Sequence, residues 1–384
     1  MATSNSDLKT AILDYLKDHS GTTKRKISDI TGFSVPTVTK VIEELDDQGL
    51  VRQQGVKDTS AGRKPTIYEF DGSNHFLIGI DLSIPKFNIA LFDLSRRLVS
   101  SEGGFLDMEA IQDDDYSEIS SALVKGINSL IEREEVPFTS IKAIGIGVPG
   151  IVREGSFKPI TRFKTDEMVP LREPIQKQFE VPVSVGNDVD KELLSVLESK
   201  DLLDEPDLVA VYLAVRSSGR HQSRVNIGGS IYHNGNILQG KNGTAGEFGH
   251  TSVSTAPDDE FPPCKCGNDT CLDNFVNTKI ANAAESGASL EEITERLNQK
   301  IKDLFFIFNP SLLVIDMEAF PEIKNNLMKG AKSFSNELSA KLCIKEIDIE
   351  TVGNSSLACA RGSIITQLDE MLTEPKSYEK FFPN

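Results

Sequence analysis

The chain has 384 residues, of which 39% are hydrophobic and 26% charged, and its formal net charge is −17 at pH 7. This length allows two or three domains, and the composition is ordinary for a soluble globular protein. The longest uninterrupted apolar run is residues 208–215, whereas a membrane-spanning helix needs about twenty residues, so we expect no membrane-spanning helix. No apolar segment with a cleavage site opens the chain, so we expect a cytoplasmic protein whose cysteines are reduced.

The negative charge is unevenly distributed along the chain. Residues 1–70 contain ten basic and ten acidic side chains, so the entire excess lies after residue 70. An acidic body repels phosphate groups, and only the N-terminal segment is therefore expected to contact nucleic acid.

Three helices are predicted before residue 50. The segment "LKTAILDYLKDHS" has apolar residues at helical spacing. A second helix follows Thr23, a suitable N-cap, and ends at Gly32, where a left-handed residue suits a tight turn. The third helix, in "FSVPTVTKVIEELDDQGLV", has Ser34 as its cap and Pro36 in its first turn, where a missing N–H is harmless. This order is typical of a helix-turn-helix.

Two short strands, 50–54 and 66–70, are predicted next, and the loop between them has a basic tip that includes Lys57. The pattern predicts a winged helix-turn-helix over residues 1–72. The alternative is a small helical domain for protein contacts; we favour DNA because basic residues gather on the second helix and the wing. The predicted contacts to operator DNA are Lys24, Ser34, Pro36, Thr37, Thr39, Lys40, Arg63 and Lys64.

Strands alternate with helices in the rest of the chain, which indicates an α/β body. The pattern restarts near residue 208 with "LVAVYLAV", which favours two lobes with a cleft between them. We predict a first lobe over residues 73–200 and a second over 201–384, with the C-terminal helix packing back on the first lobe.

Three of the five cysteines lie within eight residues, in "CKCGNDTC". Cys264, Cys266 and Cys271 supply three soft ligands, and His250 is the expected fourth. A closed shell of three cysteines and one histidine predicts a structural zinc site; the alternative is a loop of reduced cysteines. The other two cysteines are predicted to be buried thiols: Cys343 and Cys359.

The motifs "GEFGH…CKCGNDTCLD", "AGRKP", "GIGVPG", "GND" and "FNPSLLVID" occur in this order over nearly the whole chain. In this respect the sequence resembles the ROK family of sugar-responsive repressors and sugar kinases. The resemblance implies a two-lobed actin-like or ribonuclease-H-like body. With its N-terminal winged helix, the chain is similar to the branch that contains the xylose and N-acetylglucosamine repressors.

The resemblance also implies a sugar site. Its expected members are Asn187, Asp188, Glu247, His250 and Asp273, where the family usually has glutamate at the last position. In the kinases, the residue matching Asp188 is the general base, although Asp188 could instead serve only as a helix cap. The zinc is expected to fix the loop that carries Glu247 and His250.

Three nucleotide features of the family's kinases are altered. The first-lobe loop is "DLSIP", Asp81–Pro85, which lacks glycine and contains a proline without an N–H donor. A basic stretch, Arg216–Arg224, precedes Gly228–Gly229 in place of the second-lobe phosphate loop, and Asp316–Met317 replaces a glycine pair. The sequence therefore predicts that ATP binding is lost or very weak, that the protein is not an enzyme, and that Asp188 is a vestigial base.

The segment "KPITRFK" replaces another sugar-framing motif of the family and carries Lys158, Arg162 and Lys164. This segment is either a solvated loop or the source of a base that favours a phosphorylated or acidic sugar.

We expect a repressor that binds a palindromic operator as a homodimer or homotetramer and senses a sugar or sugar phosphate. The helix predicted near 290–308 supplies either a subunit contact or core packing. Two alternative functions are a sugar kinase with a DNA-binding head and a regulator controlled by a protein partner. The C-terminal tail is either loose or docked on the head.

Overall fold

The computed structural model describes residues 5–19, 21–56, 65–109, 111, 116–158, 167–218, 224–255, 260–286, 290–352 and 357–382. The chain divides into two compact units. Unit 1 comprises Met1–Val148, Val169–Gly186 and Cys359–Asn384, and unit 2 comprises Pro149–Met168 and Asn187–Ala358. The second segment of unit 1 ends at Gly186, whereas the predicted first lobe ends at residue 200. The C-terminal helices belong to unit 1.

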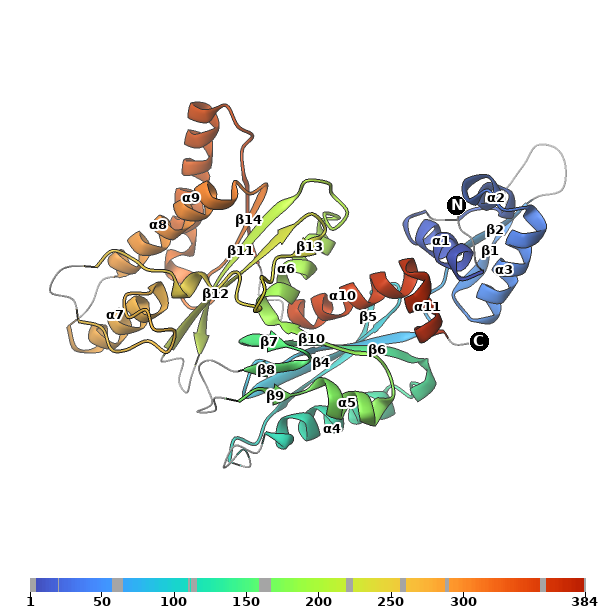
Figure 1. Ribbon diagram of the computed structural model, residues 1–384, viewed down its shortest axis with the longest axis horizontal. Coiled ribbons are helices and arrows are strands. Elements are labelled where there is room, and N and C mark those ends of the chain that lie inside the picture. The colour runs from blue at the N-terminus through green and yellow to red at the C-terminus, as the bar shows by residue number, and fades with distance from the viewer. Residues whose placement is uncertain are drawn as a thin grey trace. The chain divides into compact units, whose positions relative to one another are not determined.

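The N-terminal part of unit 1 is a winged helix-turn-helix (Figure 1). Thr23 and Ser34 cap the second and third helices, and Gly32 ends the second in the left-handed conformation with φ 76°, which confirms the predicted caps. Leucine, isoleucine and valine side chains from all three helices fill its core. Its elements are α1 (Asn5–Asp18), α2 (Lys24–Thr31), α3 (Val35–Asp47), β1 (Val51–Val56) and β2 (Thr66–Phe70).

The rest of unit 1 is a five-stranded sheet with strand order β10-β6-β3-β4-β5. β3 (Phe76–Asp81) pairs in parallel with β6 (Ile141–Val148) and antiparallel with β4 (Lys86–Asp93). Because β3 and β6 are buried on both faces, their sequences are nearly continuous apolar runs. Figure 1 shows α4 and α5 on one face of the sheet and α10 on the other. The remaining elements are β5 (Leu98–Phe105), α4 (Ser117–Arg133), β9 (Val169–Pro170), α5 (Arg172–Phe179), β10 (Val183–Asn187), α10 (Ala358–Thr373) and α11 (Pro375–Phe381).

Unit 2 is built on a second five-stranded sheet with strand order β13-β12-β11-β14-β15. The strands β11, β14 and β15 are parallel, whereas β12 and β13 are antiparallel to their neighbours. An apolar core joins this sheet to α7, α8 and α9. The elements are β7 (Ile151–Arg153), β8 (Ser156–Lys158), α6 (Asp188–Ser199), β11 (Val209–Ser218), β12 (Arg224–His233), β13 (Asn236–Ile237), α7 (Leu272–Ser286), α8 (Leu290–Phe308), β14 (Leu312–Asp316), α9 (Pro321–Leu342) and β15 (Asp348–Thr351).

The helix predicted near residues 290–308 is α8, and most of its apolar face is buried in the unit 2 core. Phe306 and Ile307 are exposed at its C-terminal end. Cys359 is buried as predicted, but Cys343 is exposed; the prediction for Cys343 was wrong because the residue ends α9 as its C-cap. Among the described residues, no helix is long and apolar enough to cross a membrane.

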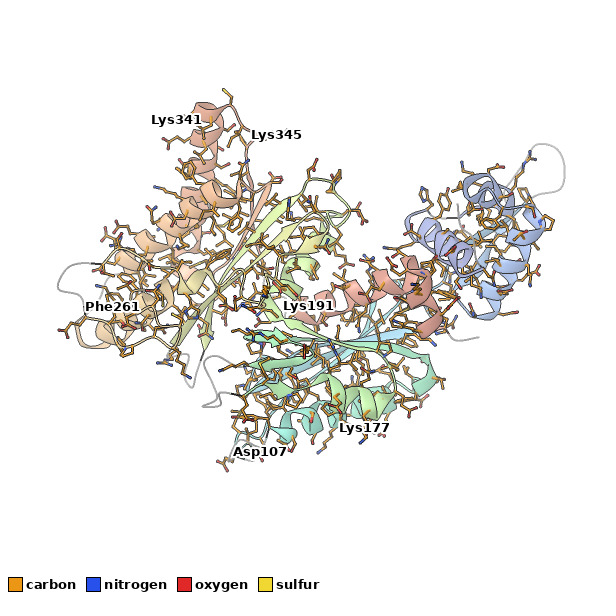
Figure 2. The ribbon with its side chains drawn as sticks, in the orientation of Figure 1. Asp107, Lys177, Lys191, Phe261, Lys341 and Lys345 are labelled. Atoms are coloured by element: carbon orange, nitrogen blue, oxygen red, sulfur yellow. The ribbon has the colours of Figure 1, made fainter. Side chains whose placement is uncertain are left out.

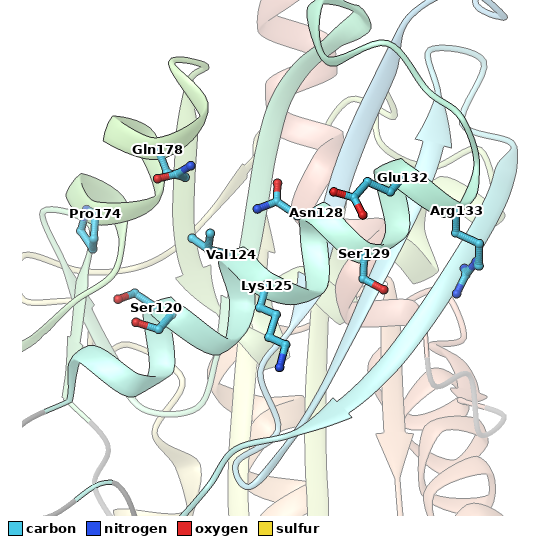
Figure 3. A pocket seen from close by; sticks show the side chains of 10 residues that line it. Ser120, Val124, Lys125, Asn128, Ser129, Glu132, Arg133, Pro174 and Gln178 are labelled. Atoms are coloured by element: carbon cyan, nitrogen blue, oxygen red, sulfur yellow. The ribbon is translucent and has the colours of Figure 1, made fainter.

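A surface groove lies between α4 and α5 of unit 1 (Figure 3). Its lining is polar and mixed in charge, and it includes Lys125, Asn128, Glu132 and Gln178. None of the predicted site residues lines it, so the groove does not bear on the predicted chemistry.

Candidate functional site

The structure brings the four predicted metal ligands together in unit 2. Their ligand atoms all lie within 4.8 Å of one another. The His250 Nδ1 atom is 4.0 Å from the Cys264 Sγ atom and 3.8 Å from the Cys271 Sγ atom, and the Cys264 sulfur is 3.3 Å from that of Cys266. Tetrahedral bonds of about 2.0–2.3 Å separate nitrogen and sulfur ligands by about 3.5–3.8 Å. The spacing of the four side chains therefore fits one metal ion.

The environment of the thiols favours their protonated form in the absence of a cation. Burial raises the pKa of Cys264 and raises that of Cys271 to about 12, while burial lowers the pKa of His250. A bound metal reverses this preference for the thiols because it coordinates thiolate. Three sulfurs and one imidazole form a donor set suited to a soft divalent cation.

The cysteine loop is continuous with the start of α7. The Cys264 N–H donates to the Asp269 side chain at 2.9 Å, and Asn274 donates to the Asp269 carbonyl at 2.7 Å. The Cys271 carbonyl accepts from the Phe275 N–H at 2.9 Å, at the beginning of α7. Disruption of the contacts among His250 and the three cysteines would therefore disturb the first turn of this helix.

The "GEFGH" segment packs backbone to backbone against β12. Gly246 has φ 92°, and a Cβ atom there would lie 2.4 Å from the carbonyl oxygen of Gly229. A Cβ atom on Gly249 would lie 2.2 Å from the carbonyl oxygen of Ile227. Gly228–Gly229, the pair that follows the basic stretch in the sequence, lies within β12, where Gly229 makes room for this segment.

Asn187 and Asp188 lie where β10 leads into α6. Asn187 is the N-cap of α6: its side-chain oxygen accepts from the N–H groups of Val189 and Asp190 at 2.9 and 3.3 Å, and its amide donates to the Gly150 carbonyl at 3.1 Å. Asp188 accepts from the Val189 N–H at 2.9 Å. Asn187 is thus the main N-cap of α6, and Asp188 follows it as the first residue of the helix.

Two further carboxylates are bonded to β12. Asp190 accepts from the buried Ser230 hydroxyl at 2.6 Å, and Asp273 accepts from the Ile227 N–H at 2.8 Å. Burial raises the pKa of each to about 6, with Ser230 and then Lys191 (Figure 2) opposing the shift at Asp190. Asp190 was not predicted, although a second acidic residue in the first turn of a helix after "GND" is a visible signal.

Glu247 is the most perturbed of these acids. Burial, and after it the charges of Asp188, Asp273 and Asp190, together raise its pKa to about 7. These four residues, which we call the carboxylate cluster, therefore interact electrostatically within unit 2. Lys191 acts on Asp190 and Arg224 acts on Asp273, and both oppose the rise in pKa of these two acids.

The carboxylate cluster fits a ligand that donates hydrogen bonds and carries no negative charge. This arrangement gives no support to the idea of a base that selects an acidic sugar. Lys158 ends β8, while Arg162 and Lys164 lie outside the described residues.

A second polar group, which we call the Arg216 cluster, lies at the carboxyl ends of β11 and β14. The Arg216 guanidinium bonds to Glu192 of α6 and, at 3.0 Å, to Asp316 at the end of β14. The buried Tyr212 hydroxyl donates to Glu192 at 3.0 Å and lies 3.1 Å from the guanidinium. Arg216 and Asp316 were both predicted to depart from the kinase pattern, but their pairing was not predicted.

The carboxyl ends of parallel strands are where open α/β sheets bind nucleotides. In unit 2 this edge holds the Arg216 cluster, and the Ser217 N–H donates to Glu318 at 2.9 Å. In unit 1 two donors of the "DLSIP" loop are already bonded within the unit. The Leu82 N–H donates to the Gly147 carbonyl of β6, and the Ser83 hydroxyl donates to Asp81. Acidic side chains and internally bonded amides are poorly suited to binding phosphate.

The predicted DNA contacts on α3 are accessible. Ser34 caps the helix by accepting from the Thr37 N–H at 3.3 Å. Pro36 and Thr37 are exposed in the first turn, and Thr39 is half-buried. The Lys40 side chain is 80% exposed and 3.9 Å from Glu44, so its charge faces solvent. This surface has the small polar and basic groups that reach a major groove.

Lys24 is oriented differently from the α3 residues. Its ammonium group lies 3.6 Å from the Glu43 carboxylate and 5.2 Å from the centre of the Tyr68 ring. It therefore contacts its own domain in the absence of DNA. The wing residues Arg63 and Lys64, and with them Lys57, lie outside the described residues.

Comparison with known proteins agrees with this geometry. Residues 6–52 match the model of winged helix-turn-helix DNA-binding segments. The xylose repressor of Caldicellulosiruptor bescii is 25% identical over 96% of this chain and 97% of its own length. The N-acetylglucosamine repressor of Escherichia coli O6:H1 is 27% identical over 87% of this chain and 86% of its own. Both relatives are named repressors.

Solved structures share the fold. A ROK family transcriptional regulator, described as a homologue of the E. coli MLC protein, superposes with a TM-score of 0.73 at 17% identity over 98% of both chains. A ROK hexokinase from Thermus thermophilus gives a TM-score of 0.55 at 18% identity over 76% of this chain and 97% of its own. The predicted fold, a winged helix followed by a ROK-type α/β body, is confirmed. Residues 77–367, well over half of the chain, match the ROK family model, and the protein belongs to the ROK family.

Proposed function

We propose that the protein is a transcriptional repressor whose DNA binding responds to a sugar bound at the carboxylate cluster of unit 2. One observation carries this proposal: the chain joins a winged helix-turn-helix to a ROK body in which the carboxylate cluster is kept while the nucleotide edge is filled by the Arg216 cluster. The protein then senses a sugar without phosphorylating it.

The names of the relatives indicate the class of effector. Xylose and N-acetylglucosamine are neutral sugars, and their hydroxyl groups can donate to Asp188, Glu247 and Asp273. The negative charge of the cluster supports a neutral sugar over its phosphate ester, because phosphate would be repelled by the same carboxylates.

We propose Zn²⁺ as the metal held by His250, Cys264, Cys266 and Cys271. A four-ligand shell leaves no open position for water, so the metal has a structural role. The ion would fix the segment that carries Glu247 and the start of α7, which carries Asp273. The chain's own carboxylates would then make the contacts to the sugar.

Operator binding would use two or more copies of the chain. A dimer presents two α3 helices to successive major grooves and therefore favours a palindromic site. A homodimer and a homotetramer both meet this requirement, and a cytoplasmic location would give the repressor access to DNA and to sugar metabolites.

Calorimetric titration tests the effector. D-xylose, N-acetylglucosamine and N-acetylglucosamine 6-phosphate are titrated separately into the zinc-loaded protein. We expect at least one neutral sugar to bind and the phosphate ester to bind more weakly. Tighter binding of the phosphate would contradict the role given to the carboxylate cluster.

DNA binding and the absence of turnover are tested separately. A duplex selected by the protein from a random-sequence library should be palindromic, and the bound sugar should weaken its retention. Incubation with hexoses and Mg-ATP should yield no ADP; ADP formation would favour the kinase alternative. Selective DNA binding without any sugar effect would favour control by a protein partner.

A further inference from the structure

The C-terminal helix α10 lies directly on the backbone of the unit 1 sheet. A Cβ atom on Gly79 of β3 would lie 2.0 Å from the Ala360 carbonyl oxygen, and one on Gly145 of β6 would lie 2.0 Å from that of Ser363. The Ser363 hydroxyl also donates to the Gly145 carbonyl at 3.0 Å. Two strands thus contact two successive turns of α10, and the helix cannot shift without disturbing the sheet.

The far end of α10 is tied to the DNA-binding head. Asp369 lies 3.1 Å from the Lys17 ammonium group, in the last turn of α1, and 3.4 Å from Arg96, in the turn after β4. Arg361, in the first turn of the same helix, donates to the Arg96 carbonyl at 2.9 Å. One helix therefore contacts both the body of unit 1 and the first helix of the head.

The short helix α11 reaches α3, the helix that presents most of the predicted DNA contacts. Tyr378 is 2% exposed, and its hydroxyl donates to the side chain of Gln48, the C-cap of α3. The ring of the buried Phe382 stands 5.1 Å from the ring of His75, whose Nε2 atom is 2.7 Å from the Gln48 carbonyl oxygen. Gln48 is thus contacted through both its side chain and its backbone.

A second polar route connects Tyr378 to α3. The Lys9 ammonium group lies 5.7 Å from the centre of the Tyr378 ring and 2.9 Å from the Glu44 carboxylate of α3. The Lys9 side chain is only 5% exposed, whereas that of Glu44 is 30% exposed, so the ion pair is shielded from solvent on the lysine side. Glu44 also accepts from Asn5 at 3.1 Å and lies 3.9 Å from Lys40, a predicted DNA contact.

We propose that α10 and α11 form a strap that sets the orientation of α3 on unit 1 and transmits the state of unit 2 to the head. The chain enters the strap at residues 358–359, where it passes from unit 2 into unit 1. A change in unit 2 that moves the start of α10 is carried along one continuous helix to Asp369 and then to Tyr378. Transmission from unit 2 rests on the proposed sugar response. The mechanical half of the proposal, that the strap sets the orientation of α3, does not.

The strap is suited to docking and release as a unit. α11 has seven residues, and a helix of this length is not stable alone in water. Its docking depends on three buried aromatic residues and on polar contacts to α1 and α3. Loss of the Tyr378 contacts would therefore free the helix and the head together, while the core of unit 2 stays intact.

Hydrogen exchange of the full, zinc-loaded chain tests the mechanical half. In Tyr378→Ala, amide exchange in α1 and α3 should rise about tenfold or more, while the amides of β11 and β14 in unit 2 keep their wild-type rates. Tyr378→Phe removes only the hydroxyl and should give a smaller rise in the same helices. Lys380→Ala changes an exposed residue of the same helix and should leave exchange unchanged. Wild-type exchange in α1 and α3 of Tyr378→Ala would overturn the strap.

DNA binding tests the transmission. A duplex selected by the wild-type chain is titrated with each variant, with and without D-xylose and N-acetylglucosamine. Tyr378→Ala should bind this duplex at least tenfold more weakly and lose the sugar effect, and Lys380→Ala should retain both. Faster exchange in the head together with wild-type DNA affinity and sugar response would overturn the transmission. If no duplex or sugar binds the wild type, the proposed function fails, and hydrogen exchange alone decides the strap.

Discussion

The carboxylate cluster and the Arg216 cluster lie on the same unit and share one helix, but they differ in charge balance. α6 contributes Asp188 and Asp190 to the first and Glu192 to the second. In the carboxylate cluster, neighbouring acids raise the pKa of Glu247. In the Arg216 cluster, a guanidinium and a phenol hydroxyl satisfy the two acids directly.

Under the proposed function, this difference explains how one ROK body binds a sugar without binding a nucleotide. An excess of acceptors gains free energy when a sugar supplies hydroxyl donors. A cluster that already pairs its charges gains little from a phosphate and would repel it through Glu192 and Asp316. The following variants test whether the two clusters behave as differently as their charges predict.

Removal of the metal should have the largest effect on stability, because the metal would hold the two segments that carry Glu247 and Asp273 of the carboxylate cluster. Cys271→Ser replaces the buried ligand, and we expect loss of bound zinc and a fall in melting temperature of more than about 10 °C, since structural zinc contributes several kcal/mol to folding. Zinc analysis by mass spectrometry and a thermal melt measure both. Cys343→Ser, at an exposed cysteine outside the cluster, should retain zinc and stability. Full zinc content in Cys271→Ser would contradict the ligand assignment.

Arg216→Met should come next in size. It leaves the Glu192 and Asp316 carboxylates facing each other without their cation, which should lower the free energy of unfolding by about 2–4 kcal/mol. Adding Glu192→Gln should recover part of this loss, because the remaining repulsion disappears. Urea denaturation measures the free energy of each variant.

The surface pair of Lys200 and Glu350, 2.7 Å apart, provides a matched control in the same unit. Lys200→Met should cost less than about 1 kcal/mol, because exposed ion pairs contribute little. An equal effect of Arg216→Met and Lys200→Met would contradict the importance of the Arg216 cluster. Binding of Mg-ATP by Arg216→Met would instead indicate that this cluster alone blocks a nucleotide.

The winged helix and the metal ligands could be predicted because each depends on short-range sequence signals. Thr23, Gly32 and Ser34 act within one turn of the chain. The cysteine spacing, with a histidine in a glycine-bounded turn, strongly restricts the chemistry.

The pairings within unit 2 could not be predicted, because they depend on strand register and on contacts distant in sequence. Arg216 meets Asp316 because β11 and β14 are parallel with Ala214 opposite Asp316. The packing role of Gly229 could not be predicted either, because a glycine pair has the same sequence in a strand and in a loop. Only the approach of the "GEFGH" segment shows that packing requires it.

Asp188→Ala tests the carboxylate cluster directly. We expect a loss of sugar affinity of about 10- to 100-fold, corresponding to about 1.5–3 kcal/mol for hydrogen bonds to a charged group, with operator affinity unchanged. Calorimetry and a DNA-binding titration measure the two effects. Glu198→Ala, at a half-buried acid near the other end of α6, should leave sugar affinity unchanged, and a wild-type sugar response in Asp188→Ala would remove Asp188 from the site.

Asp190→Asn should have an effect that is confined to a pH window. Burial raises the pKa of Asp190 from 3.8 to about 6, so the native state binds a proton that the unfolded state releases between these values. The wild type therefore loses stability as pH rises through this window, by roughly 3 kcal/mol at most, and the loss is complete above pH 6. Asparagine can still accept from Ser230 but does not ionise, so the difference in unfolding free energy between variant and wild type should grow from pH 4 to pH 6.5 and then stay constant. Urea denaturation across this range measures the difference. A constant difference from pH 4 to pH 8 would mean that Asp190 keeps an ordinary pKa and stays largely ionised over this range.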